Sequence, residues 1–144
     1  MSWLVLLLLA VLLPAAEVTV TKAWSRATLP GQEAGAVFAL ITGGETDDRL
    51  IAVESGAANV IELHEHATGA DGVMTMRAVQ GGLAVAAHAT VELKPRSYHI
   101  MLIGLKTPLV KTTPVPVVFV FERTGRIAVS AEVLDPWAMT ADDR

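Results

Sequence analysis

The stretch that decides the fold is residues 60–103, which read VIELHEHATGADGVMTMRAVQGGLAVAAHATVELKPRSYHIMLI. Three short apolar segments lie in it, at 60–66, 73–79 and 98–103, and turn-forming glycine, aspartate or proline residues separate them. Apolar and polar residues alternate along the first segment, which is typical of a half-buried strand, and the segments are too short for buried helices. We therefore predict three strands here.

The same pattern continues through the rest of this stretch and on both sides of it. Seven more segments read as short strands between turn signals, and no segment after residue 16 keeps a helical period of 3.6 with caps. The seven are 17–24, 35–42, 50–55, 83–86, 90–93, 115–122 and 126–133. Residues 45–49 are expected to be a solvated loop. Regular short strands with frequent turns predict an all-β sandwich or barrel.

The first sixteen residues differ from the rest. An unbroken apolar run from Leu4 to Leu13 is followed by Pro14-Ala15-Ala16, and the run is too short to span a bilayer. We predict that 1–16 is a cleavable signal peptide with processing near Glu17; an uncleaved anchor is the alternative. The mature chain is then one domain, 17–135, followed by a loose tail, 136–144, from which Trp137 packs back.

Composition excludes several classes of protein. The net charge is −4 with no basic stripe, which argues against nucleic-acid binding. The 144 residues include no cysteine, so they offer no disulfide, zinc-thiolate site, thiol redox centre, blue-copper site or lipid-acceptor thiol. No His-Glu-x-x-His, phosphate loop or serine-hydrolase motif is present.

Soft and borderline metal ligands gather in the three central strands. Their clusters are His64-Glu65-His66, Met74-Thr75-Met76 and His99-Ile100-Met101. A strand sends residues i and i+2 to one face, so the members of each cluster project together. If the strands meet at one end of a sheet, two imidazoles and two thioethers converge, a set that suits Cu(I) better than Zn²⁺ and far better than Mg²⁺ or Ca²⁺.

Geometry leaves some assignments within these clusters open. His64 points away from the core face that Ile61 and Leu63 mark, as a surface residue also would. His66 shares that face and is either a spare ligand or a solvent-facing side chain. Met74 and Met76 share a face, so spacing within the strand does not choose between them. His88 lies in a loop and is expected to be exposed.

The three clusters also carry a family resemblance. The segments Glu62–His66, 71–77 and Tyr98–Leu102 resemble the signature of the periplasmic copper chaperones of the PCu(A)C type. Ala-Trp-Ser-Arg-Ala at 23–27 and Gly-Leu-Lys-Thr-Pro-Leu at 104–109 match as well, and the resemblance spans about residues 17–133. It implies a cupredoxin-like Greek-key β-sandwich and a metal site made of the following residues: His64, Met76, His99 and Met101.

The resemblance implies a function too. The protein would be a periplasmic, monomeric Cu(I) chaperone, with no stable membrane insertion after signal cleavage. It would deliver copper to a copper-accepting protein, either the Cu(A) domain of cytochrome c oxidase or an assembly factor. Some relatives hold a second copper in a His/Met-rich tail, but here Met139 stands alone in the tail. The alternatives are an enzyme, such as a small copper-dependent oxidase or a hydrolase, and a structural sandwich domain that binds no metal.

Overall fold

The computed structural model describes residues 17–143, so the predicted signal peptide lies outside the described residues. Within 17–143 the chain forms ten strands and no helix, which confirms the all-β prediction. Each predicted strand is present, with ends that differ by at most two residues from the expected ones. The strands are β1 (Thr19–Arg26), β2 (Ala34–Thr42), β3 (Asp48–Glu54), β4 (Ala58–Thr68), β5 (Met74–Ala78), β6 (Leu83–Val85), β7 (Thr90–Leu93), β8 (His99–Leu105), β9 (Val115–Phe121) and β10 (Gly125–Leu134).

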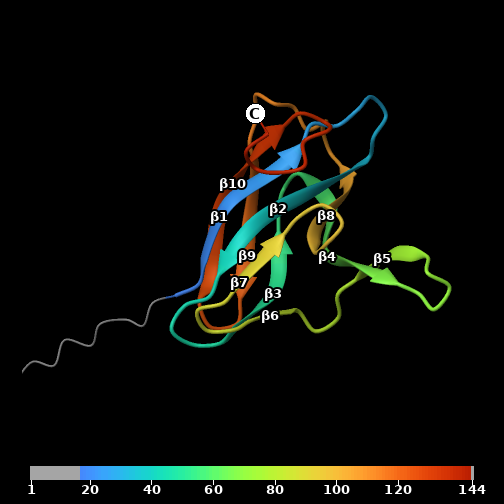
Figure 1. The fold of residues 1–144 in the computed structure, drawn as a ribbon. Helices are drawn as coiled ribbons and strands as arrows, with labels where there is room; N and C mark the ends of the chain where they lie inside the picture. The colour runs from blue at the N-terminus through green and yellow to red at the C-terminus, as the bar shows by residue number, and fades with distance from the viewer. Residues whose placement is uncertain (1–16, 144) are drawn as a thin grey trace, which may run out of the picture.

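The strands form two layers of a sandwich (Figure 1). Their pairing order is β5-β4-β8-β2-β1-β10-β9-β3-β6, with β7 paired to β2. One layer holds β5, β4, β8, β2, β7 and β1, and the other holds β10, β9, β3 and β6; parallel pairing of β1 with β10 joins them. Most connections pass between non-adjacent strands, as in Greek-key sandwiches.

The core lies between the two layers. Alternate residues of β9 are buried, from Val115 through Phe119 to Phe121, and Ile100 and Leu102 of β8 meet them from the other layer. Each fully buried side chain of this size contributes about 1.5–3 kcal/mol relative to an exposed one. Because the inward-facing positions are occupied by apolar side chains, polar side chains of the same strands face outward.

A bulge in β1 sends an aromatic side chain to the outer face of the first layer. The register with β2 shifts between Thr21 and Trp24, and Lys22 has a φ of 51°. A one-residue shift moves the following side chains to the opposite face. Trp24 therefore leaves the main core and stacks on Phe38 of β2, with ring centroids 4.5 Å apart.

The C-terminal residues pack on that outer face. Ala138 is buried against Trp24 and Phe38, and the Arg26 Nε donates to the Ala138 carbonyl at 2.6 Å. Trp137, expected to pack back, is instead 74% exposed. Within the tail, Ala138 and Ala141 thus pack on the sheet, because the bulge leaves an apolar patch that they cover.

The predicted loop at 45–49 is shorter than expected. β3 begins at Asp48, whose side chain is buried and accepts hydrogen bonds from the turn between β9 and β10. Because residues 45–49 are all polar, the sequence did not indicate that Asp48 is hydrogen-bonded to Arg123 and Thr124. No helix among residues 17–143 has the length and apolarity to cross a membrane.

Candidate metal centre

Three adjacent strands, β5, β4 and β8, bring the histidine and methionine clusters together. In the antiparallel ladders His64 lies opposite His99, and His66 lies opposite Met76. Directly opposed residues share a face, as do residues i and i+2 of one strand. One outer face therefore carries His64 and His66 from β4, Met76 from β5, and His99 and Met101 from β8.

The other face of the same strands explains this orientation. Leu63 lies opposite Ile100, and Ile61 lies opposite Leu102. All four contact the main core, and the two β8 residues are fully buried. Burial of these apolar residues fixes which face of β4 and β8 is turned outward, so the alternation read from the sequence is confirmed.

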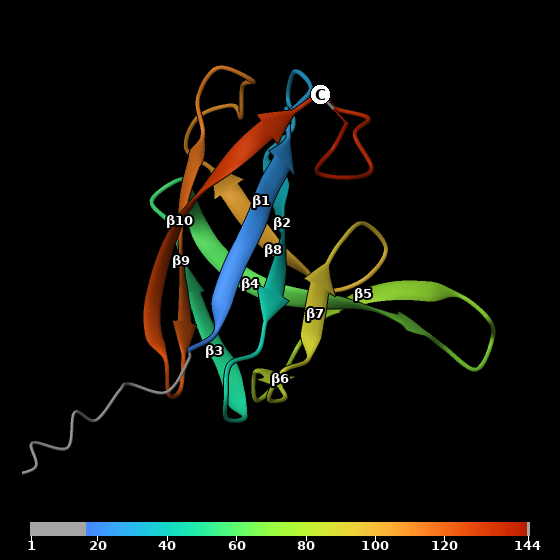
Figure 2. The same cartoon turned by 60° about the vertical axis from the view of Figure 1, so that its left-hand side comes forward.

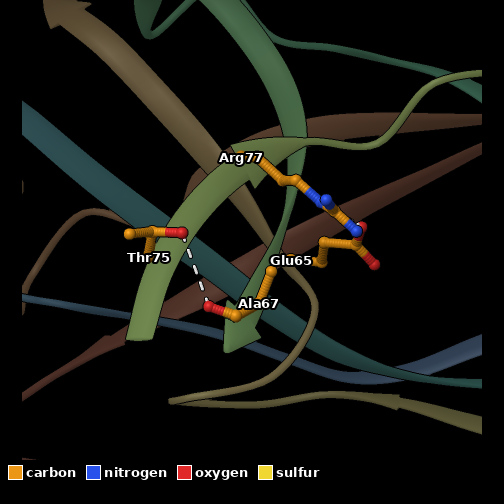
Figure 3. A network of polar contacts seen from close by, with 4 residues as sticks. All are labelled: Glu65, Ala67, Thr75 and Arg77. Atoms are coloured by element: carbon orange, nitrogen blue, oxygen red, sulfur yellow. Dashed lines mark hydrogen bonds and ion pairs between the residues drawn. The ribbon is translucent and has the colours of Figure 1, made fainter. Parts of the chain in front are cut away.

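The hairpin of β4 and β5 extends beyond the sandwich (Figure 2). On the face of the hairpin opposite to His66 and Met76, two contacts join β4 and β5 (Figure 3). Arg77 Nε donates to Glu65 at 2.9 Å, and the Thr75 hydroxyl donates to the Ala67 carbonyl at 3.4 Å. Since these contacts lie on the face opposite to His66 and Met76, they align the ladder without occupying the face that carries the predicted ligands.

An open pocket of about 340 Å³ lies on the outer face. Three of the four predicted ligands line it, namely Met76, His99 and Met101, and so does His66. His64 does not line it, although its ring centroid is 5.9 Å from that of His99. The remaining walls are Arg26, Ala36, Phe38, Pro95, Arg96 and Met139.

His99 presents one free nitrogen to this pocket. Its side chain is buried, and Nδ1 lies 2.9 Å from the Ser97 carbonyl oxygen. A carbonyl only accepts, so Nδ1 carries the hydrogen and Nε2 keeps its lone pair. Burial lowers the pKa of His99, and nearby His66 and His64 lower it further, against the opposing effect of the Ser97 carbonyl. The ring is therefore neutral at neutral pH, the form in which imidazole binds metals.

His64 has an unsatisfied nitrogen. Its Nε2 lies 2.7 Å from the Glu62 carboxylate, while its Nδ1 is buried and has no hydrogen-bond partner. A neutral ring that donates from Nε2 has its lone pair on Nδ1. A buried acceptor without a donor costs free energy, and a bound cation would satisfy it. The arrangement therefore fits a metal ion that needs a second imidazole.

The register of the hairpin separates the two β5 methionines. Met76 lies opposite His66 and lines the pocket, whereas Met74 lies opposite Thr68, farther along the projecting arm, and does not line it. Both side chains are more than half exposed. The family resemblance had selected Met76, but the spacing within β5 could not make this distinction, because it depends on the length of the 69–73 turn.

His88 lies where the sequence predicts, and Met139 does not. His88 occupies a turn with a φ of 59°, and its side chain is 68% exposed, as expected. Met139, expected to stand alone, lines the pocket beside Arg26, which donates to its sulfur at 3.1 Å and lies 5.8 Å from the Phe38 ring centre. Arg26 and Phe38 were not predicted as pocket residues. The bulge in β1 that positions Arg26 has no sequence signal, whereas Phe38 faces outward because its neighbours Val37 and Ala39 lie in the main core.

The donor set is one of nitrogen and sulfur. Among residues 17–143 no group of three or more histidines and carboxylates is arranged to hold a metal ion. A larger pocket, about 550 Å³, lies between β3 and β4 and is lined mostly by apolar residues, with no histidine or methionine. The thioether-containing pocket is therefore the candidate centre, and its donors favour a soft cation.

Comparison with known proteins identifies the family. The family model described as "Putative lipoprotein LpqE-like" matches residues 18–133. The chain belongs to the LpqE-like family. This LpqE-like chain is 34% identical over 118 residues to a protein named "Putative lipoprotein Lxx21020" from Leifsonia xyli subsp. xyli (strain CTCB07). The alignment covers 82% of this chain and 70% of that relative.

Solved structures share the fold of this LpqE-like chain. The apo PCuAC domain from PmoF1 has a TM-score of 0.71 at 21% identity, covering 86% of this chain and 98% of that one. The copper-bound PCuAC domain from PmoF2 has a TM-score of 0.68 at 19% identity, covering 86% and 97%. CuI-DR1885 from Deinococcus radiodurans has a TM-score of 0.64 at 23% identity, covering 90% and 84%. The predicted resemblance to PCu(A)C domains is thus confirmed for the fold.

Proposed function

We propose that this protein binds one Cu(I) ion as cargo and passes it to a copper-accepting protein outside the cytoplasm. The ligands would be His64, Met76, His99 and Met101. The observation that carries the proposal is the convergence of two imidazoles and two thioethers on one outer face, with a free lone pair on His99 and an unsatisfied one on His64. Two relatives of the same fold bear names that state copper or Cu(I) binding.

The chemistry of the donors favours Cu(I) over other ions. Thioethers are poor ligands for Zn²⁺ and for oxygen-preferring ions, but they suit Cu(I). No thiolate is available in the 144 residues, so an intense thiolate-to-copper absorption is not expected. A site without thiolate also resists the oxidation that would destroy a free cysteine outside the cytoplasm.

The openness of the site favours a carrier over an enzyme. Met76 is 53% exposed, on an arm that projects from the sandwich. A weakly held thioether at an exposed position can leave first, while a thiolate or thioether of the acceptor enters. The acceptor would be the Cu(A) domain of cytochrome c oxidase or one of its assembly factors. The chain would act as a monomer after export, and the family name, which describes lipoproteins, agrees with a place in the cell envelope.

A transfer experiment tests the proposal. The purified protein is loaded with one equivalent of Cu(I) without oxygen, its affinity is measured against a competing chelator, and it is mixed with an apo Cu(A) domain. After separation, the metal on each protein is assayed. We expect stoichiometric loading followed by transfer to the acceptor. Failure to load would refute copper binding, and loading without transfer, accompanied by turnover of an oxidisable substrate, would favour an oxidase.

A further inference from the structure

We propose that His66 is a fifth metal ligand of this site, able to replace His64 in the coordination shell of the ion. The inference rests on the proposed function, because it takes Cu(I) as the ion bound. It goes beyond the four residues of that proposal. It assigns the neighbouring imidazole a part in receiving and releasing the metal.

The position of His66 is the first argument. His66 lies on the same face of β4 as His64, and it is directly opposite Met76 in the β4–β5 ladder. It lines the pocket together with Met76 and His99, whereas His64 does not. An ion entering from solvent would therefore meet the imidazole of His66 before that of His64.

The spacing of the rings is the second argument. The ring centroid of His66 is 5.4 Å from that of His99, and the centroid of His64 is 5.9 Å from it. A metal–nitrogen bond of about 2.0–2.1 Å puts each ring centre about 3.2 Å from the ion, so the centres of two imidazoles that share an ion are about 5.2 Å apart at the tetrahedral angle and up to about 6.4 Å apart at wider angles. Both histidines meet this condition with respect to His99.

The third argument is the difference in hydrogen bonding between the His64 and His66 rings. One nitrogen of His64 is held by Glu62 at 2.7 Å. Among residues 17–143 no group forms a hydrogen bond or ion pair with the His66 imidazole, and this side chain is half-buried. Its ring is therefore free to turn one nitrogen toward an ion without breaking a polar contact.

The exchange is a simple ligand substitution. The bond from copper to the His64 nitrogen breaks as a bond to a His66 nitrogen forms, and both rings stay neutral. Copper remains Cu(I), so the step requires no electron donor or acceptor. The ion moves toward the exposed side of the pocket, where Met76 lies, and His66 is the last imidazole that it leaves before transfer.

The test compares four variants, H64A, H66A, H64A/H66A and H88A, in Cu(I) competition with a chelator. H88A is the matched control, because His88 is an exposed histidine outside the pocket. We expect H64A to lose about 10–100-fold in affinity, the range for perturbing a supporting residue, because His66 takes over. The double variant should lose more than about 100-fold further, since no second imidazole remains.

A spectroscopic measurement makes the test independent of affinity. Long-range ¹H–¹⁵N spectra of H64A, or of H64N if H64A does not fold, should show the His66 imidazole nitrogen shifting when Cu(I) is added. Unchanged His66 signals, or a double variant no weaker than H64A, would overturn the inference and mean that His66 only packs against Met76. In that case wild-type loading would still stand, whereas wild-type protein that takes up no Cu(I) would overturn the proposed function as well.

Discussion

Replacing Asp48 with asparagine should destabilise the fold more than any other single change of a carboxylate to an amide in the described chain. The Asp48 carboxylate accepts four hydrogen bonds from three residues. Oδ1 accepts from the Arg49 and Arg123 backbone N–H groups at 2.7 and 2.9 Å, and Oδ2 accepts from the Thr124 N–H and hydroxyl at 2.9 and 2.7 Å. These bonds fasten the start of β3 to the β9–β10 turn.

The expected cost follows from these contacts. Asparagine replaces one oxygen with an NH₂ group, so two donors that faced that oxygen lose their acceptor whichever way the amide lies. Hydrogen bonds to a charged group are each worth about 1.5–3 kcal/mol, and the Thr124 hydroxyl can rotate to reduce the loss. We therefore expect D48N to lower the free energy of unfolding by about 2–4 kcal/mol.

Urea denaturation at pH 7 measures this loss. The matched control is E54Q, because Glu54 pairs with Arg126 on the surface, where both side chains are more than half exposed. Surface pairs contribute little, so E54Q should leave the midpoint nearly unchanged. Equal effects of D48N and E54Q would show that the buried hydrogen bonds do not stabilise the fold as argued.

The pH dependence of stability gives a second measure of Asp48. Burial alone would raise its pKa, but the hydrogen bonds from Thr124, Arg123 and Arg49 outweigh burial and lower the pKa from 3.8 to about 2. A carboxyl with a lower pKa in the folded state stabilises the fold above the unfolded value and loses this effect as pH falls through the folded value. Wild-type stability should therefore decline between about pH 4 and pH 2 more steeply than that of D48N.

Three further substitutions test the site and the turns. E62Q should weaken Cu(I) binding about tenfold, because the charge that orients His64 is lost, and chelator competition would show no change if Glu62 is irrelevant. M76L should weaken Cu(I) binding more than M74L does; the reverse order would contradict the assignment made from the hairpin register. G82A should cost about 1–3 kcal/mol in urea denaturation, since Gly82 has a φ of 82° and its Cβ would lie 2.5 Å from the Leu50 carbonyl oxygen; an unchanged midpoint would contradict this.

The strands were predictable because their signal is local. Alternation at Ile61, Leu63 and His64 already marks which face of β4 is buried, and most of the turns between the strands contain glycine or proline. The order of the strands in the two layers could not be read from local sequence patterns. Parallel pairing of β1 with β10 brings together residues more than a hundred positions apart, and only the family resemblance implied a sandwich of this type.

The site was partly predictable for the same reason. The i, i+2 spacing of His99 and Met101 puts them on one face in any strand. Which residues of the hairpin meet them depends on register, which the 69–73 turn sets and the spacing within β5 does not. His66 was left open between a spare ligand and a solvent-facing side chain, and the structure places it among the pocket residues.

The walls of the pocket were the least predictable part. Arg26 and Met139 meet Phe38 of β2 there because the bulge at Lys22 turns Trp24 and Arg26 outward and the tail packs over them. A bulge requires only a local change of backbone conformation, and a lysine gives no sign of one. The packing of Ala138 on Trp24 and Phe38 was likewise not predictable, because the tail sequence shows no hydrophobic period or motif.

X-ray absorption of the protein loaded with one equivalent of Cu(I) tests the central proposal most directly, because it reports the type and number of atoms bound to the metal. The proposed ligands predict a shell of nitrogen and sulfur, two of each, with His64 or His66 supplying one nitrogen and His99 the other. Loss of the sulfur contribution in a variant with both Met76 and Met101 replaced by leucine would agree with this assignment. A shell of nitrogen and oxygen alone in the wild-type protein would contradict it.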